Sequence, residues 1–208
     1  MRKPTSMKGL EDLGRFRLSR HFFLRDFLSS EIGQIYNIPN IPDHPALAIQ
    51  RGQQLCQQLL DPLSDTFGRI GIRSGYRSAA LNAFGNQHNL NCARNDHPGE
   101  CHIWDRPGRA VAGVSIVIPW FADHYAQGRD WRDLAWWLHD HLRYSEMWFF
   151  PKLCALNLSW RPDPWRKISS YIAPRGTLLA RGAAPGESLL QRQARYGDFP
   201  PFGGMAAH

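Results

Sequence analysis

The first third of the chain has apolar residues at helical spacing. This pattern predicts a helix over residues 18–32, with Ser19 as its N-cap. A second helix is predicted over residues 43–68, because Asp43 is a favourable N-cap and apolar residues recur along the segment. Pro62 should kink or break this second helix, since proline lacks a backbone donor.

The remainder of the chain shows mostly strand-like patterns. Alternating or apolar runs predict strands at 69–74, 102–105, 113–118, 146–150, 155–160 and 169–172. Two further helices are expected, a short one over 78–84 and a longer one over 130–142. Residues 85–99 are rich in Asn and Gly, which is typical of an exposed loop.

This order of elements predicts an α+β fold, in which N-terminal helices pack on a mainly antiparallel sheet. We expect a basic leader at 1–17, a folded domain at 18–175 and a weakly ordered tail at 176–208 that is rich in Gly, Pro, Arg and Ala. The sequence has no strict β-α-β-α alternation and no Gly-rich phosphate loop. This argues against a nucleotide-binding fold.

Composition agrees with a folded domain. Hydrophobic residues make up 43% of the 208 residues and include eight Trp and eleven Phe, enough for a buried core. The longest apolar run, 112–121, is too short to cross a bilayer. No apolar signal segment precedes Arg15, so the expected location is cytoplasmic; release from the cell or association with a particle is the alternative.

The chain is basic, with a formal charge of +7. Residues 1–25 contain seven Lys or Arg against only Glu11 and Asp12. Such a segment either meets a polyanion, such as nucleic acid, anionic lipid or an anionic wall polymer, or is simply solvated. Because no helix-turn-helix or RNA-stacking motif is present, nucleic acid is the least favoured partner.

The most specific local pattern is Ile-Gly-Ile-Arg-Ser-Gly-Tyr-Arg-Ser-Ala-Ala-Leu-Asn at residues 70–82. It predicts a strand that ends at a Gly turn and presents Tyr76, Arg77 and Asn82 beside a loop. An arginine at such an edge can hold a carboxylate or an oxyanion through paired hydrogen bonds. The alternative is that Arg77 is an ordinary surface or ion-paired residue.

This motif resembles that of the D-alanyl-D-alanine carboxypeptidase (hedgehog/DD-peptidase) superfamily of zinc peptidases. The resemblance extends over about residues 20–175 in the order of elements, but its specific part is the thirteen-residue stretch. It implies a hedgehog/DD-peptidase-like fold and a peptidoglycan substrate. It also implies that Arg77 assists substrate binding and transition-state charge, with Ser74, Tyr76 and Asn82 beside it in the substrate site.

The second family motif, Ser-x-His-x-x-Gly-x-Ala-x-Asp, carries two zinc ligands. The matching window here is 95–105, in which Asp105 stands where the ligand Asp should be. His97 lies one residue out of register, and His102 is a second candidate metal ligand. Strand geometry would place His102 and Asp105 on opposite faces, which favours His97 as the partner of Asp105.

The family's third ligand is a His near a late Trp, but Arg161 follows Trp160 here. A guanidinium cannot bind zinc and would repel it. Either another histidine completes the site or catalysis has been lost. The candidates to complete the site are His124, His139 and His141. The candidate general bases are Glu146, Glu100 and Asp163.

A complete site would make the protein a zinc carboxypeptidase or endopeptidase. The zinc would activate water for hydrolysis of peptidoglycan stem peptides that contain D-Ala. An incomplete site would leave an inactive wall-binding or structural protein. Two rival uses of the same loop are a closed zinc site, made by Cys92, His97, Cys101 and His102, and a Cys92–Cys101 disulfide.

Overall fold

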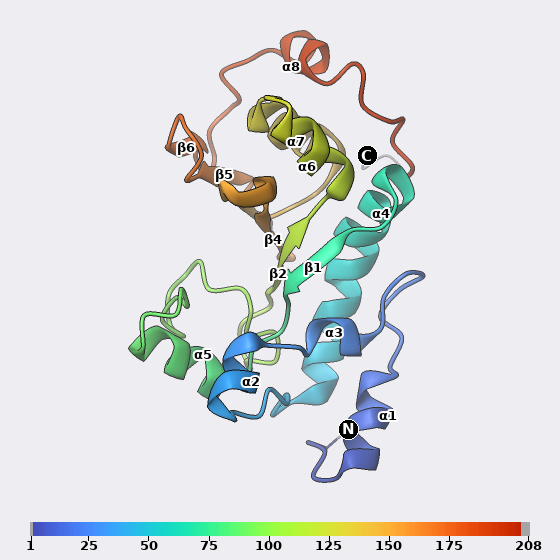
Figure 1. Cartoon of the computed structure of the whole chain (residues 1–208), viewed down its shortest axis with the longest axis vertical. Coiled ribbons are helices and arrows are strands. Elements are labelled where there is room, and N and C mark those ends of the chain that lie inside the picture. Colours follow the sequence, from blue (N-terminus) through green and yellow to red (C-terminus); the bar gives the residue numbers. More distant parts are fainter. Residues whose placement is uncertain (1, 205–208) are drawn as a thin grey trace. The chain divides into compact units, whose positions relative to one another are not determined.

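The structure, a computed structural model, describes residues 2–204. Its helices and its sheet give the α+β class that the sequence predicts. The chain forms two compact units, and each unit combines two separate stretches of sequence. The first contains Met1–Gln57 and Ser74–Val114, and the second contains Gln58–Arg73 and Ser115–His208. Figure 1 follows the chain through both.

The helices of the first unit are short. They are α1 (Met7–Gly14), α2 (Glu31–Tyr36), α3 (Pro45–Leu55) and α5 (Ala79–Gln87). The predicted helix over 18–32 is wrong, because only a 3₁₀ turn at Leu24–Phe27 and the start of α2 are helical there. Phe23 is extended and pairs with Arg17 in a β-bridge, and Ser30 caps the new helix α2.

The predicted long helix over 43–68 is confirmed in outline. A π-helical turn, Cys56–Leu60, follows α3 and leads into α4 (Asp61–Phe67), which ends at Gly68 with a φ of 77°. The irregular turn lies just before Pro62, whose ring and missing N–H disrupt regular α-helical hydrogen bonding. The expected interruption therefore takes the form of a π turn. The expected N-cap, Asp43, is replaced by His44, whose side chain makes no capping hydrogen bond.

Six strands form one sheet in the order β1-β2-β4-β3-β5-β6. They are β1 (Gly71–Ser74), β2 (Ala112–Val117), β3 (Glu146–Phe149), β4 (Leu156–Trp160), β5 (Lys167–Ser170) and β6 (Gly176–Leu179). β3 is antiparallel to β4 and parallel to β5, and β6 is antiparallel to β5. Five of the six predicted strands are thereby confirmed.

The strand predicted at 102–105 is wrong. These residues form turns, and the backbone N–H groups of His102 and Ile103 both donate to the side chain of Glu100. A backbone whose donors are bound to a nearby carboxylate cannot pair in a ladder at the same time. The apolar character of the segment instead reflects burial, since Ile103 and Trp104 are 2% and 0% exposed.

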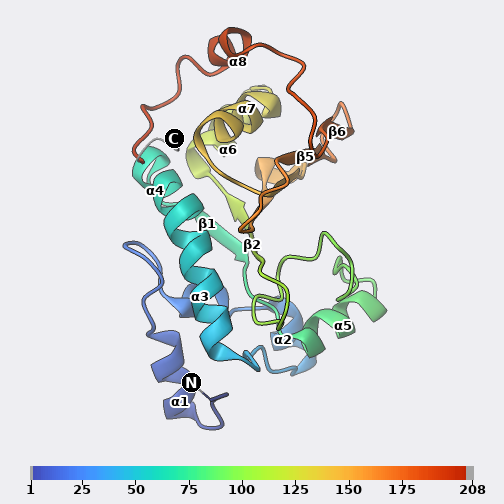
Figure 2. The ribbon, with the colours of Figure 1, turned by 180° about the vertical axis from the view of Figure 1, so that it is seen from behind.

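Besides α4, the described part of the second unit contains three helices. They are α6 (Pro119–Ala126), which the sequence reading missed, α7 (Trp131–His141) and α8 (Leu189–Arg195). The predicted helix over 130–142 is confirmed as α7, with Asp130 capping it by accepting from the backbone N–H of Arg132. The view from behind shows α6 and α7 next to each other, with the chain of α8 passing beyond them (Figure 2).

The region expected to be a weakly ordered tail contains both β6 and α8. Arg192 of α8 forms a two-pronged ion pair with Asp140 of α7, and both side chains are at least nine-tenths covered. Composition could not reveal this ion pair, because its two partners lie about fifty residues apart in the sequence. In the described part of the chain, no helix is both long enough and apolar enough to span a membrane.

Candidate ligand site around Asp105

The Gly of the Ser-Gly-Tyr-Arg motif allows two segments of the first unit to approach closely. A Cβ atom at Gly75 would lie 2.6 Å from the Cβ of Phe27 and 2.7 Å from its Cα. Tyr76 follows it and is fully buried, with its ring edge-on to Trp104. The motif therefore forms a tightly packed turn whose side chains point inward.

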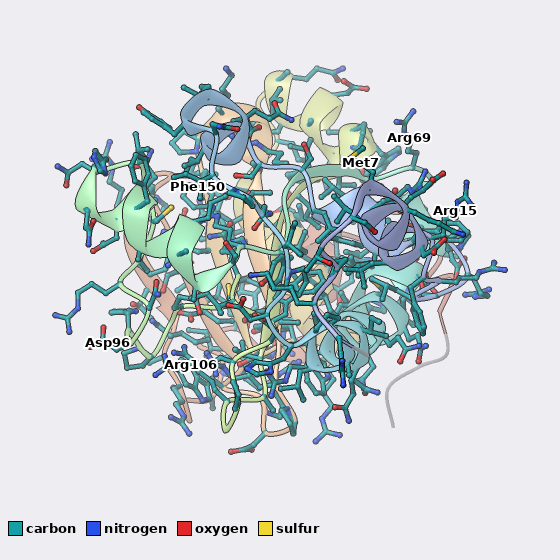
Figure 3. The ribbon with its side chains drawn as sticks, turned by 90° about the horizontal axis from the view of Figure 1, so that it is seen from below. Met7, Arg15, Arg69, Asp96, Arg106 and Phe150 are labelled. Atoms are coloured by element: carbon teal, nitrogen blue, oxygen red, sulfur yellow. The ribbon has the colours of Figure 1, made fainter. Side chains whose placement is uncertain are left out.

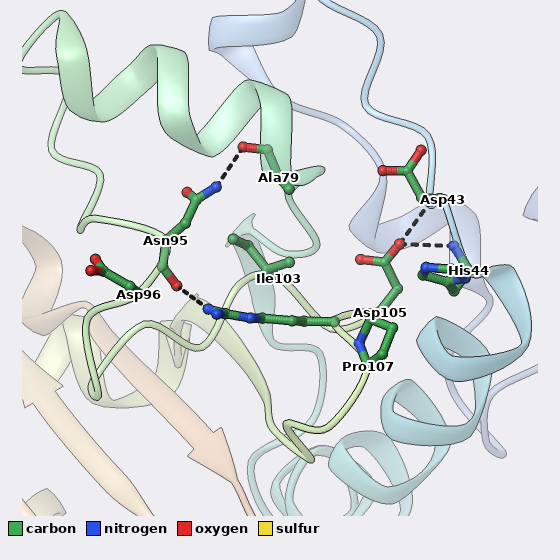
Figure 4. Close-up of a pocket in the computed structure, with 9 residues that line it drawn as sticks. Asp43, His44, Ala79, Asn95, Asp96, Ile103, Asp105 and Pro107 are labelled. Atoms are coloured by element: carbon green, nitrogen blue, oxygen red, sulfur yellow. Dashed lines mark hydrogen bonds between the residues drawn. The ribbon is translucent and has the colours of Figure 1, made fainter.

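Asp105 is buried, and its carboxylate accepts three hydrogen bonds. Oδ2 accepts from the backbone N–H groups of Asp43 (2.7 Å) and His44 (3.0 Å), and Oδ1 accepts from the hydroxyl of Tyr76 (3.1 Å). His44 is the N-cap residue of α3, so this carboxylate lies at the positive end of that helix. Asp105 thus does the capping that the side chains of Asp43 and His44 do not do (Figure 4).

His102 is buried and points toward the motif. Its Nδ1 lies 2.7 Å from the carbonyl oxygen of Gly75, which can only accept, so Nδ1 carries the proton. Its own carbonyl accepts from the backbone N–H of Arg77. Burial, together with the nearby positive charge of Arg77, lowers the pKa of His102 to about 3. The imidazole is therefore neutral at physiological pH and joins the loop to the motif.

His97 is exposed, and its Nδ1 accepts from the backbone N–H of Gly99 at 3.0 Å. Within residues 2–204, no three His, Cys, Asp or Glu side chains gather as a group that could hold a metal ion. Asp105, moreover, already uses both of its oxygens for Tyr76 and the start of α3. The donor set predicted from His97, His102 and Asp105 does not fit a zinc ion in this arrangement.

Arg77, the predicted substrate-binding arginine, is half-buried and has Glu100 nearby, but its hydrogen-bond acceptors are neutral groups. Its guanidinium donates to Ser74 Oγ (3.1 Å), Asn82 Oδ1 (3.4 Å) and Cys92 Sγ (3.2 Å). The structure thus brings Ser74, Arg77 and Asn82 together, as the resemblance implies. These contacts fix the arginine and tie the motif to the loop that follows α5.

Two of the candidate general bases have well-defined surroundings. Glu100 is 3% exposed, and its Oε1 accepts from the backbone of His102 and Ile103, whereas Oε2 has no hydrogen-bond partner among the described residues. Burial raises the pKa of Glu100. Glu146 belongs to the second unit, where Lys167 Nζ donates to it at 2.8 Å. The third candidate, Asp163, is exposed.

The candidates for the third metal ligand all lie in the second unit. Each imidazole engages its Nδ1 locally: His124 and His141 with carbonyls of their own helices, and His139 with the hydroxyl of Tyr144. Arg161, which follows Trp160, lies over the ring of Trp165, 4.1 Å from its centroid. Each of these side chains therefore has a local contact that explains its position without a metal ion.

The rival cysteine arrangements also receive no support from the geometry. All four cysteines belong to the described residues, where they are buried and form no disulfide. Cys92 packs against α5, where a Cβ at Gly85 would come within 2.4 Å of its Sγ, while Cys101 packs against Gly113 in the same way. Burial raises the pKa of Cys92.

A cavity of about 320 Å³ opens beside Asp105 within the first unit. It is lined by Asp43, His44, Ala79, Asn95, Asp96, Ile103, Asp105, Arg106 and Pro107. The close-up in Figure 4 shows the Asp105 carboxylate turned toward the backbone of Asp43 and His44. Asp96 and Arg106 lie on the surface of this unit (Figure 3). We refer to this cavity as the Asp105 pocket.

The Asp105 pocket has both signs of charge at its rim. Asp96 pairs with Arg94, and Asp43 pairs with Lys3 at 2.6 Å. Arg106 uses Nη1 to donate to the carbonyl of Asn95 at 2.7 Å, which leaves Nε and Nη2 for other acceptors. Such a cavity suits a small ligand that has a carboxylate and an amino group.

Three residues that support the pocket escaped the sequence reading. The Asn40 side chain bonds to the carbonyls of Leu28 and Tyr76 and to the N–H of Ser78. The buried Arg51 donates to the carbonyls of Trp104 and Arg106, and Asn95 joins Ala79 to Asn82. Their partners are distant in sequence, so only the Pro/Asn composition around Asn40 gave any local signal.

Comparison of the chain with models of known families, with characterised proteins and with solved structures found no match. The superfamily resemblance therefore depends on the motif residues alone.

Proposed function

We propose that this protein is a non-catalytic relative of the DD-peptidases that binds peptidoglycan stem peptides in the Asp105 pocket. The observation that carries this proposal is the use of Asp105. Asp105 is the residue that best matches a zinc ligand. Its carboxylate accepts hydrogen bonds from the backbone N–H groups at the start of α3 and from the hydroxyl of Tyr76. Freeing it for a metal would leave a helix end and a buried hydroxyl without partners.

The chemistry of the pocket rim supports a peptide ligand. A stem peptide offers a terminal carboxylate and, at its diamino acid, a free amino group. Arg106 has guanidinium donors that face no acceptor among the described residues, and these suit the carboxylate. Asp96 and Asp43 lie on the same rim and suit the amino group.

The departure at Arg161 agrees with loss of catalysis. A fixed positive charge stands at the sequence position where the family has its third ligand, and Trp165 lies against it. Binding without hydrolysis needs only the pocket and its charged rim. It needs no activated water and no general base.

The test combines binding and product release on the purified chain. Isothermal titration with a synthetic pentapeptide ending in D-Ala-D-Ala should give a measurable Kd, and incubation with added zinc should release no D-Ala. Arg106→Gln should weaken binding about tenfold, as expected for loss of one charge-assisted contact. The matched control Arg143→Gln, at an exposed arginine of the second unit, should leave the Kd unchanged.

Zinc-dependent release of D-Ala would contradict the non-catalytic part of this proposal and return the chain to the hydrolases. Absence of heat and of chemical-shift change with the peptide at millimolar concentration would contradict the binding part.

A further inference from the structure

Two stretches of the first unit contain no Asp, Glu, Lys or Arg, although such residues make up 21% of the chain. They are residues 32–42 and 78–93, which include most of α2 and all of α5. The helices lie side by side in Figures 1 and 2. Their contact is close, since a Cβ at Gly33 of α2 would lie 3.1 Å from Leu81 of α5. The two stretches therefore form one uncharged surface, the α2/α5 face.

Aromatic rings lie at the centre of the α2/α5 face. The ring of Tyr36 is 4.9 Å from that of Phe84, which stacks on His88 at 3.9 Å between centroids and 22° between planes. Tyr36 is 46% exposed, and its neighbour Ile35 is 75% exposed. A contiguous exposed aromatic group on a folded unit indicates a binding surface rather than a core.

Residues with side-chain amides neighbour these rings in the sequence, on the same two segments. Asn37, Gln87, Asn89 and Asn91 are exposed, and their side chains form no hydrogen bond with any residue in the described part of the chain. Asn37, Asn89 and Asn91 have left-handed backbone, with φ values of 53°, 56° and 57°. Asparagine tolerates this conformation, which explains why it occurs at these three positions. This explanation does not account for Gln87, which lies in the last turn of α5.

The segment after α5 that carries Asn89 and Asn91 is held against the helix. The backbone N–H of Leu90 donates to the carbonyl of Gly85 at 2.8 Å, and Asn86 Nδ2 donates to the carbonyl of Cys92 at 2.8 Å. The amides are thus presented from a fixed backbone, which reduces the conformational entropy lost when a ligand binds.

We propose that the α2/α5 face binds an uncharged saccharide chain, with a sugar ring stacked on Tyr36 and the amides hydrogen-bonded to its hydroxyl groups. A side-chain amide has both donors and an acceptor and so matches paired hydroxyls, and an aromatic face matches the C–H face of a sugar ring. Nucleic acid and anionic lipid are disfavoured, because neither stretch contains a Lys or Arg to attract them. A wholly apolar protein partner would leave four amides buried without partners, which is costly.

None of the rings and amides named here lines the Asp105 pocket, and the inference does not depend on the proposed function. The probe is tetra-N-acetylchitotetraose, with cellotetraose as a second neutral chain and heparin as an anionic one. Titration of the full chain, followed by ¹H–¹⁵N NMR, should shift the side-chain amide signals of Gln87, Asn89 and Asn91 with at least one neutral chain. Heparin should not shift them.

Substitutions then locate the site. Tyr36→Ala should weaken saccharide binding about tenfold, as for loss of a central aromatic contact. Tyr36→Phe keeps the ring and should retain most of the affinity, which separates stacking from a folding defect. The matched control is Tyr171→Ala, at a tyrosine of the second unit that is 52% exposed, and it should have no effect.

Three outcomes would overturn the inference. The first is the absence of any amide shift with both neutral chains at millimolar concentration. The second is binding that Tyr36→Ala leaves unchanged. The third is a chain that sediments as a dimer and becomes monomeric with Ile35→Asp, because a second copy of the chain would then cover this face.

Discussion

Asp105 in the first unit and Asp140 in the second are both carboxylates withdrawn from water, but their partners differ. Asp105 accepts from two backbone N–H groups and from the hydroxyl of Tyr76, all of them neutral donors. Asp140 accepts from the guanidinium of Arg192 and, at 2.7 Å, from the hydroxyl of Tyr196. Asp105 is thus held by neutral donors at a helix end, with the charge of the buried Arg51 nearby but not hydrogen-bonded to it, whereas Asp140 forms a direct ion pair with Arg192.

The difference teaches what each carboxylate does for the fold. Asp105 is only 4% exposed and accepts from three donors at the start of α3 and on Tyr76, so its removal leaves all three without their acceptor. Asp140 on α7 binds Arg192 on α8, a helix of only seven residues, so separation of this one short helix would be enough to expose both charges to water. We therefore expect the hydrogen bonds to Asp105 to contribute more to the free energy of unfolding than the ion pair between Asp140 and Arg192.

The largest expected effect is that of Asp105→Ala. We predict a loss of about 3–5 kcal/mol in the free energy of unfolding, because the helix end and the Tyr76 hydroxyl lose their acceptor. Urea unfolding followed by circular dichroism measures it. Asp105→Asn keeps one acceptor oxygen and should lose less than the alanine variant. Equal losses for both variants would show that charge alone, not hydrogen bonding, matters here.

Asp140→Ala should have a smaller effect, about 2–3 kcal/mol, since it leaves Arg192 without its partner in a largely covered position. Thermal unfolding at constant ionic strength measures it. The control is Leu190→Ala on the same helix, at a side chain that is 78% exposed, with a change within about 0.5 kcal/mol. A loss for Asp140→Ala larger than that for Asp105→Ala would reverse the comparison.

The two regions also contain one histidine each whose pKa is lowered by burial, His102 fully buried and His139 partly buried, and both predict acid sensitivity. The pKa is lowered to about 3 for His102 and to about 4 for His139, chiefly by burial and further by a nearby arginine. The unfolded chain therefore binds more protons than the folded chain, so stability should fall as the pH drops from about 6.5 toward these values.

Replacing either histidine with a group that does not titrate should make this pH dependence shallower. For one fully released proton the unfolding equilibrium constant changes about tenfold per pH unit. His102→Gln should reduce the slope over a wider pH range than His139→Gln, because the shift of His102 is larger. Glu100 acts in the opposite sense: its raised pKa makes stability fall as pH rises above its ordinary value of 4.5. Identical slopes in the wild type and in both variants would contradict these assignments.

The smallest effect is expected at the mouth of the Asp105 pocket. Asp96→Asn removes a solvent-exposed ion pair with Arg94 and should leave the unfolding temperature unchanged. The same substitution should weaken binding of the D-Ala-terminated pentapeptide, because Asp96 lines the pocket. Destabilisation without any change in Kd would show that Asp96 is a structural residue only.

Local patterns predicted helices and strands well where the signal lies within the element itself. The caps Asp130 and Ser78 and the alternation around β3 and β4 are short-range signals, and the corresponding elements are present. The helix over 18–32 failed because Asp26 accepts from the backbone N–H of Phe23 and starts a turn instead. The strand at 102–105 failed because its apolar residues are buried in a turn whose donors bind Glu100.

The sequence could predict which residues gather at the site, but not which contacts they make. The motif did place Ser74, Arg77 and Asn82 together. It could not show that Asp105 lies at the start of α3, because that contact joins residues more than sixty positions apart. The role of a carboxylate depends on which donors reach it, and sequence spacing does not contain that information.

The most direct test of the account is the zinc content of the folded chain. The protein is incubated with excess zinc, separated from unbound metal by gel filtration, and analysed by mass spectrometry for zinc per chain. Because Asp105 is occupied by the start of α3 and by Tyr76, we predict no stoichiometric zinc, with no difference between the wild type and Asp105→Asn. Stoichiometric zinc in the wild type that Asp105→Asn abolishes would contradict the account.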